Sequence, residues 1–201
     1  MRTVVAGIGN IFLSDDAFGV ELAKRLSNEQ LPEGVTVADY GIRGMHLAYD
    51  LLEIAPDTTI LLDAVSRGDE PGTLYVLQIG PGHVADIEPA AVDAHGMAPD
   101  AVLALLDNLG GSAGRTLLVG CEPASTEEGI GLSQTVAAAV EKAVGVVLDL
   151  LTNKEGSETD AASAAVLGLN DRSGHSGGSG IQGRGSVQAD QRPVIPNPPR
   201  R

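Results

Sequence analysis

The sequence has a single cysteine and few basic residues, and each shortage excludes a class of protein. One cysteine in 201 residues permits neither an internal disulfide framework nor a four-cysteine zinc site. Only 13 Lys and Arg stand against 27 Asp and Glu, which gives a formal net charge of −14. We do not expect a nucleic-acid or an anionic-membrane partner, because their phosphates would repel such a chain.

Long apolar runs are also missing from the sequence. No stretch approaches the roughly 20 apolar residues that a membrane-spanning helix needs. The first three residues, Met-Arg-Thr, lead directly into a strand pattern and show no feature of a signal peptide. We therefore expect a cytoplasmic protein.

The composition divides the chain into two parts. Residues 153–201 are rich in Gly, Ser and Pro and have no sustained apolar period, so we predict a disordered tail. Residues 1–152 hold 7 of the 13 Lys and Arg and 22 of the 27 Asp and Glu. The folded domain predicted for 1–152 therefore carries a net charge of −15, and the tail carries +1.

Strand and helix patterns alternate along residues 1–152, which predicts an α/β fold. We expect three layers, with a doubly wound, mainly parallel, five-stranded twisted sheet and helices on both faces. One strand, 73–78, should run antiparallel to 59–65, because residues 66–72 are too few for a parallel crossover. The other predicted strands are 3–6, 35–38 and 116–120, and the predicted helices are 17–29, 44–54, 99–108 and 133–151.

A glycine turn at residues 7–9 follows the first strand, and Asp15 and Asp16 follow at the start of the first helix. Phe12 replaces the third glycine of the dinucleotide fingerprint, and no Gly-Lys-Ser/Thr phosphate loop is present. Two carboxylates beside a helix N-terminus would repel a phosphate. They suit a cation, or equally a helix start, where acids stabilise the helix by roughly 0.3–1 kcal/mol and Ser14 is a suitable N-cap.

Two further polar residues are expected at the same edge of the sheet. Asp63 ends a hydrophobic central strand, where an unpaired charge is costly, and His95 lies in the loop before the third helix. Ligands bind beyond the carboxyl ends of parallel strands, which is where Asp16, Asp39 and Asp63 fall. Two carboxylates and an imidazole suit nickel, iron or zinc. The sequence has no HExxH motif, so it does not predict a familiar zinc hydrolase.

Six sequence blocks resemble the [NiFe]-hydrogenase maturation endopeptidases. In order and spacing they are GIGNIFLSDDAFG, DYGIRGM, ILLDAV, PGTLYVL, DAHGM and LVGCEPA, and the resemblance covers about residues 1–150. It implies a twisted α/β sheet and an enzyme that removes the C-terminal extension of a hydrogenase large-subunit precursor once nickel has been inserted. Two positions depart from the family pattern: Ala17 stands where many members have glycine, and Tyr40 replaces the first glycine of a frequent DGG turn.

The resemblance also implies the site and its partner. Asp16, Asp63 and His95 fall on the three metal-contacting positions of the family, and the same three residues are the catalytic candidates. The nickel is implied to belong to the precursor, so the enzyme alone should be metal-free, and we expect a monomer. An aspartyl-type mechanism, with Asp16 or Asp63 as general base, and a metal-dependent one both stay open.

Two other functions remain compatible with the same fold. One is a non-catalytic metal- or nucleotide-binding α/β module, and the other is a different α/β hydrolase or peptidase that shares only the architecture. Several residues near the motifs have structural interpretations. Asp15 is expected to start the helix or orient a ligand, Asp93 to orient His95, Asp39, Gly41 and Gly44 to shape a turn, Cys121 to fill the core, and His46 and His83 to lie on the surface.

Overall fold

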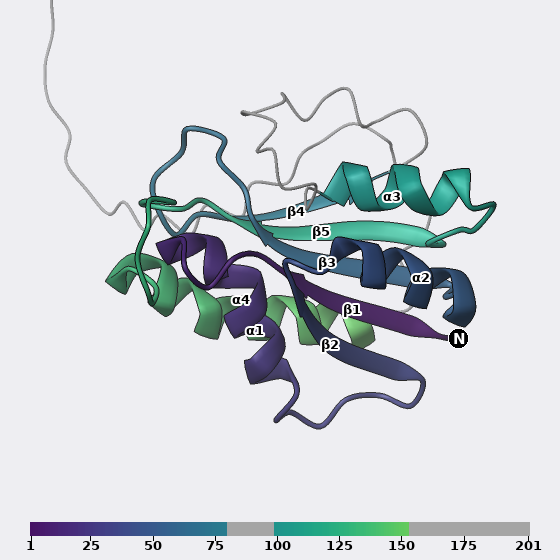
Figure 1. The fold of residues 1–201 in the computed structure, drawn as a ribbon. Coiled ribbons are helices and arrows are strands. Elements are labelled where there is room, and N and C mark those ends of the chain that lie inside the picture. The colour runs from purple at the N-terminus through teal and green to yellow at the C-terminus, as the bar shows by residue number, and fades with distance from the viewer. Residues whose placement is uncertain (80–98, 153–201) are drawn as a thin grey trace, which may run out of the picture. The chain divides into compact units, whose positions relative to one another are not determined.

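The structure is a computed structural model that describes residues 1–79 and 99–152 (Figure 1). The predicted tail at 153–201, together with His83, Asp93 and His95, lies outside the described residues. The strands are β1 (Thr3–Ile8), β2 (Val35–Gly41), β3 (Thr58–Ala64), β4 (Leu74–Ile79) and β5 (Arg115–Cys121). The helices are the 3-10 helix η1 (Ser14–Ala17), α1 (Phe18–Leu26), α2 (Gly44–Ile54), α3 (Pro99–Asn108) and α4 (Gln134–Thr152).

The five strands form one sheet in the order β2-β1-β3-β5-β4, which confirms the predicted fold class. The β1–β2, β1–β3 and β3–β5 pairs are parallel, and β4 runs antiparallel to β5. The predicted direction of β4 is therefore correct, but its hydrogen-bonded neighbour is β5, and β3 lies one strand further in. The connection between β3 and β4 has enough residues to pass the end of β5, since neighbouring strands lie only about 4.8 Å apart.

Helices cover both faces of the sheet and bury a separate core on each (Figure 1). On β3, Ile60 and Leu62 pack against α1 and α4, whereas Leu61 packs against α2 and α3. Side chains alternate between faces along a strand, so a continuous apolar run is the pattern expected for a strand covered on both sides. By the same alternation, Asp63 follows Leu61 on the α2 and α3 face.

The helix bounds agree closely with the sequence pattern except around α1. Helices α2 and α3 have the predicted bounds, and the stripe Phe18, Leu22 and Leu26 is fully buried as expected. The predicted helix 17–29 is shorter: the segment before it forms η1, and α1 ends at Leu26. Beyond that end, the backbone N–H groups of Asn28 and Glu29 bond to carbonyls three residues back, which is a tighter winding than the α-helix.

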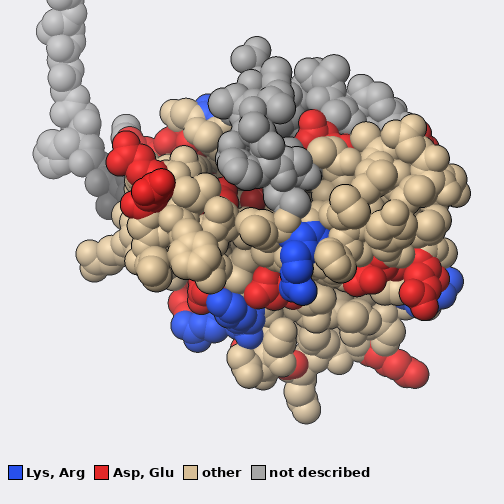
Figure 2. All heavy atoms as spheres, viewed as in Figure 1, with Lys and Arg blue, Asp and Glu red and all other residues tan. Residues whose placement is uncertain are grey.

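Exposed ion pairs contribute little to this packing. On the face drawn in Figure 2, Asp and Glu atoms lie at several separate places, Lys and Arg atoms gather at a few, and most of the surface is neutral. The described residues contain two ion pairs, Lys24–Glu21 and Arg25–Glu141, both largely exposed to solvent. Exposed pairs are worth about 0–1 kcal/mol, so these two pairs add little to the stability that the two apolar cores provide. Among the described residues, no helix is both long and apolar enough to cross a membrane.

Two glycines let the segment carrying η1 and α1 approach the strands at backbone distance. A Cβ at Gly9 would overlap the carbonyl oxygen of Asp16, and Gly9 also has a φ of +133°, which side chains rarely adopt. A Cβ at Gly19 would overlap the carbonyl oxygens of Leu62 and Ile8. The absence of these two Cβ atoms therefore brings η1 against the carboxyl ends of β1 and β3.

Gly19→Ala should destabilise the fold, because the new methyl group can only be accommodated if α1 moves away from β3 and β1. We expect a loss of about 2–3 kcal/mol in the free energy of unfolding. Gly145→Ala in α4 is the matched control, since a Cβ there meets no atom within 4 Å. The control should gain about 0.5–1 kcal/mol in chemical denaturation. Equal stabilities for the two variants would contradict the close approach at Gly19.

Candidate active site

Asp16 lies in η1, at the edge of the sheet where β1 and β3 end. Its side chain is half-buried, and its Oδ2 accepts a hydrogen bond of 2.6 Å from the backbone N–H of Asn10. Asn10 belongs to the turn that follows Gly9. The glycine turn and the carboxylate are therefore held together directly, because the turn supplies a backbone donor to the acid.

Asp63 lies next to the end of β3, also half-buried, and its Oδ1 accepts a hydrogen bond of 2.9 Å from the N–H of Ala64. Burial raises the pKa of Asp63 well above its ordinary value, and the negative charge of Asp16 raises that pKa further. The Ala64 N–H lowers it only in part. Asp16 and Asp63 are thus electrostatic neighbours at the carboxyl edge of the parallel strands.

The third predicted ligand, His95, falls outside the described residues, four positions before the start of α3. Within residues 1–79 and 99–152, no three His, Cys, Asp or Glu side chains come together as a metal site would require. The donor pair Asp16 and Asp63 still fits a divalent first-row ion, for which carboxylates and imidazoles are common ligands. The three-residue assignment stays a prediction.

Asp15 has a different environment from its neighbour Asp16. Its side chain is fully buried and accepts three backbone hydrogen bonds from the segment between β5 and α4. The donors are Ala124 (2.9 Å), Ser125 (3.2 Å) and Ser133 (2.6 Å). Asp15 lies at a helix start as expected, yet its carboxylate binds another segment and not its own helix. It therefore ties η1 to residues 124–133.

Ser14 does not cap the helix, so that interpretation of the sequence is wrong. Leu13 occupies the N-cap position of η1, and no side chain there bonds to the first turn. Ser14 instead has a φ of +50°, and its N–H and hydroxyl donate to the carbonyls of Gly129 (3.0 Å) and Glu127 (3.0 Å). Ser14 bonds to the same segment that Asp15 holds. These contacts replace the capping bond that a serine at a helix start usually makes.

Glu122 is a second buried carboxylate at this edge, which the sequence motifs did not single out. It accepts hydrogen bonds from the hydroxyl of Tyr75 (2.5 Å) and the N–H groups of Arg67 (2.8 Å) and Gly68 (3.1 Å). Burial acts to raise the pKa of Glu122, but these donors outweigh burial and lower it. Glu122 holds the loop that follows Asp63. Its signal in the sequence is an acid directly after a buried strand, in the block LVGCEPA.

The other residues near the motifs pack in the core, stabilise a turn or lie on the surface. Cys121 is fully buried in the α1 and α4 core, and burial raises its thiol pKa. Tyr40, the departure from the family's turn, is buried and donates its hydroxyl to Asp50 at 2.8 Å. Arg43 donates to the carbonyls of Asp39 and Tyr40 and so closes the turn after β2. His46 is exposed on α2.

An α/β sheet with paired carboxylates at the carboxyl ends of its parallel strands is an architecture for a hydrolytic or metal-recognising site. The family model described as hydrogenase maturation protease matches residues 20–150, more than half of the chain. The chain belongs to the hydrogenase maturation protease family, which confirms the resemblance found in the sequence blocks. It is a peptide hydrolase of hydrogenase maturation, so the non-catalytic interpretation is set aside.

Similar proteins support the same conclusion. The hydrogenase 2 maturation protease of Escherichia coli (strain K12) is 36% identical over 75% of this chain and 91% of its own length. The hydrogenase expression/formation protein HupD of Rhizobium leguminosarum bv. viciae is 32% identical over 73% and 74%. Among solved structures, the hydrogenase maturating endopeptidase HybD of E. coli matches 75% of this chain and 92% of its own, at 36% identity and a TM-score of 0.65.

Asp15→Asn should destabilise the protein. The amide retains one acceptor oxygen, and its NH₂ group would face a backbone donor in the buried site now filled by the second carboxylate oxygen. We expect a loss of about 1–3 kcal/mol in the free energy of unfolding, because a charged acceptor is lost and a backbone donor is left facing the amide. Asp107→Asn, at an exposed position on α3, should change stability by less than about 0.5 kcal/mol. If both variants melt like the parent, Asp15 does not hold residues 124–133.

Asp63→Asn should stabilise the protein in a pH-dependent way. The folded pKa of Asp63 lies above the unfolded value of about 3.9, so its negative charge opposes folding at neutral pH. The variant should be more stable than the parent at pH 7–8. This gain should shrink as the pH falls through the folded pKa, and should vanish below about pH 4, where Asp63 is protonated in both states. Urea denaturation across this range measures the difference, and a constant or reversed difference would contradict the assignment.

Proposed function

We propose that the protein removes the C-terminal extension of a [NiFe]-hydrogenase large-subunit precursor after nickel has been inserted. Asp16, Asp63 and His95 bind the nickel that the precursor already carries, so this nickel is part of the substrate. The observation that supports this role best is the raised pKa of Asp63 beside Asp16. Two carboxylates that repel each other at a sheet edge are both stabilised when a cation binds between them.

Recognition of the substrate's nickel couples cleavage to correct metal loading. A precursor without nickel presents no cation to Asp16 and Asp63, and the two acids then repel other anionic groups. A loaded precursor is anchored by its metal, which brings the neighbouring peptide to the carboxyl edge of the sheet. The protease has no need of a resident metal in this scheme, and it acts as a monomer in the cytoplasm.

The reaction adds water across one peptide bond of the precursor. The C–N bond breaks, the water oxygen becomes part of the new C-terminal carboxylate, and a proton passes to the leaving amine. A carboxylate within hydrogen-bonding reach of that water would transfer the proton. Asp16 and Asp63 are the described groups at this edge with that chemistry, so the residues that recognise the nickel are also the candidates for general base.

Cleavage of a nickel-loaded precursor tests the proposal. Asp63→Asn and His95→Ala should fold as well as the parent, yet should cleave about 100-fold more slowly or worse. Asp16→Glu should be the mildest change, because either carboxylate reaches a metal from this position. The measurement is a time course of precursor processing on gels, beside thermal melts of each variant.

The matched control is Asp57→Asn, which removes an exposed carboxylate at the opposite end of β3. It should cleave the loaded precursor at the parent rate. No variant should cleave the nickel-free precursor at an appreciable rate, and neither should the parent. A stable and fully active Asp63→Asn would refute the proposed role of the site.

A further inference from the structure

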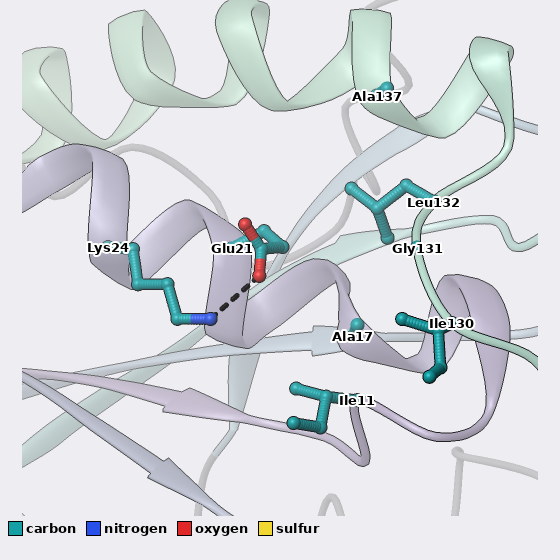
Figure 3. A pocket seen from close by; sticks show the side chains of 8 residues that line it. All are labelled: Ile11, Ala17, Glu21, Lys24, Ile130, Gly131, Leu132 and Ala137. Carbon is teal, nitrogen blue, oxygen red and sulfur yellow. Dashed lines mark hydrogen bonds and ion pairs between the residues drawn. The ribbon is translucent and has the colours of Figure 1, made fainter.

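A pocket of about 420 Å³ lies beside η1, between the turn after β1, helix α1 and the segment that leads into α4 (Figure 3). In Figure 3, Ile11, Ile130 and Leu132 surround it on the side of the two loops, and the Glu21–Lys24 ion pair lies on the side of α1. Ala17, the residue directly after Asp16, also lines the pocket. The pocket therefore adjoins the candidate site through the backbone of η1.

The rim of this pocket exposes large apolar side chains. Ile130 is 86% exposed and Ile11 is 42% exposed, and both line the pocket. Scattered apolar residues are normal on a protein surface, but a contiguous set around a hollow marks an interaction site. Glu21 and Lys24 pair with each other at 2.8 Å, so the polar side of the pocket presents little net charge. An apolar rim beside a neutral ion pair suits a ligand that places an apolar side chain in the pocket and a polar backbone next to it.

The exposed apolar wall is fixed to the segment that carries Asp16. The N–H of Gly129 donates to the carbonyl of Phe12 at 2.9 Å, and the N–H of Ser14 donates back to the carbonyl of Gly129 at 3.0 Å. Asp15 adds three hydrogen bonds between η1 and residues 124–133. Ile130 follows Gly129 directly, so its position is set by the contacts that place η1. Such preorganisation lowers the entropy cost of binding a partner.

We propose that this pocket binds an apolar side chain of the precursor, in the polypeptide segment that flanks the scissile bond. This inference rests on the proposed function and adds a second, metal-independent contact to it. Asn10 bonds to the carboxylate of Asp16, and the next residue, Ile11, forms part of the pocket wall. An apolar pocket therefore lies beside the turn and the 3-10 helix that carry the Asp16 anchor. The pocket selects the precursor by sequence, whereas the carboxylates select it by metal content.

Ile130→Ser tests the pocket without endangering the fold, because the side chain is almost fully exposed. With the nickel-loaded precursor, KM should rise about tenfold while kcat changes by less than about twofold, since the lost contact is made equally before and during the reaction. Leu109→Ser, which alters an exposed leucine just beyond α3, should leave both constants unchanged. An unchanged KM for Ile130→Ser would refute the pocket.

Binding of the nickel-free precursor separates this inference from the proposed function. Ile130→Ser should weaken that binding about tenfold, whereas Asp63→Asn should leave it unchanged. If Ile130→Ser binds and cleaves like the parent while Asp63→Asn is inactive, the pocket proposal fails and the proposed function stands. If Asp63→Asn is fully active but Ile130→Ser raises KM, the nickel role fails and the pocket contact stands.

Photocrosslinking identifies the occupant directly. With p-benzoylphenylalanine in place of Ile130, the crosslink to the nickel-loaded precursor should map by mass spectrometry to residues on either side of the cleavage point. A crosslink to a second copy of this chain, or to its own residues 153–201, would assign the pocket to another occupant and overturn the proposal.

Discussion

The position of Asp16 depends on a close contact between backbones. Gly9 and Gly19 carry no Cβ at the two points where the segment of η1 and α1 meets the ends of β1 and β3. With side chains there, α1 would have to move outward, and Asp16 would leave the neighbourhood of Asp63. A contact of this kind tolerates very small residues only, because packed interiors have no free volume for an extra methyl group. The electrostatic interaction between the two acids follows from this steric constraint.

Asp15 and Asp16 are adjacent in the sequence but have different roles in the structure. Asp15 is buried and satisfied by three backbone donors, so it organises residues 124–133. Asp16 is half-exposed, and its charge helps to raise the pKa of Asp63. Glu122 likewise accepts backbone hydrogen bonds from the loop after β3 and holds that loop in place. Two buried carboxylates thus fix the loops beside Asp16 and Asp63. We infer that this rigidity keeps Asp16 and Asp63 together despite their repulsion, and that the stability lost through that repulsion is recovered when the substrate's cation binds.

Most of the fold could be predicted, because the period of the apolar residues and the lengths of the segments indicate its helices and strands. The bounds of α2 and α3, the buried stripe of α1 and the direction of β4 all follow from local patterns. The misjudged features depend on contacts between distant segments. Ser14 bonds to residues more than a hundred positions away, and β4 pairs with a strand that comes later in the chain. The roles of Glu122 and Ile130 could not be predicted either, because they depend on loops that meet only in the folded protein. The assignment of His95 rests on the family resemblance alone, since it lies outside the described residues.

A double-mutant cycle on Asp16 and Asp63 tests the central claim most directly. The dissociation constant of the nickel-loaded precursor is measured for the parent, Asp16→Asn, Asp63→Asn and the double variant, each also against nickel-free precursor. If both carboxylates bind one nickel ion, each single change removes most of the metal-dependent affinity, and the double change removes little more. The coupling should exceed about 1 kcal/mol for the loaded precursor and be absent for the nickel-free one. Losses that simply add, or that are equal for the two precursors, would contradict a shared nickel ligand pair.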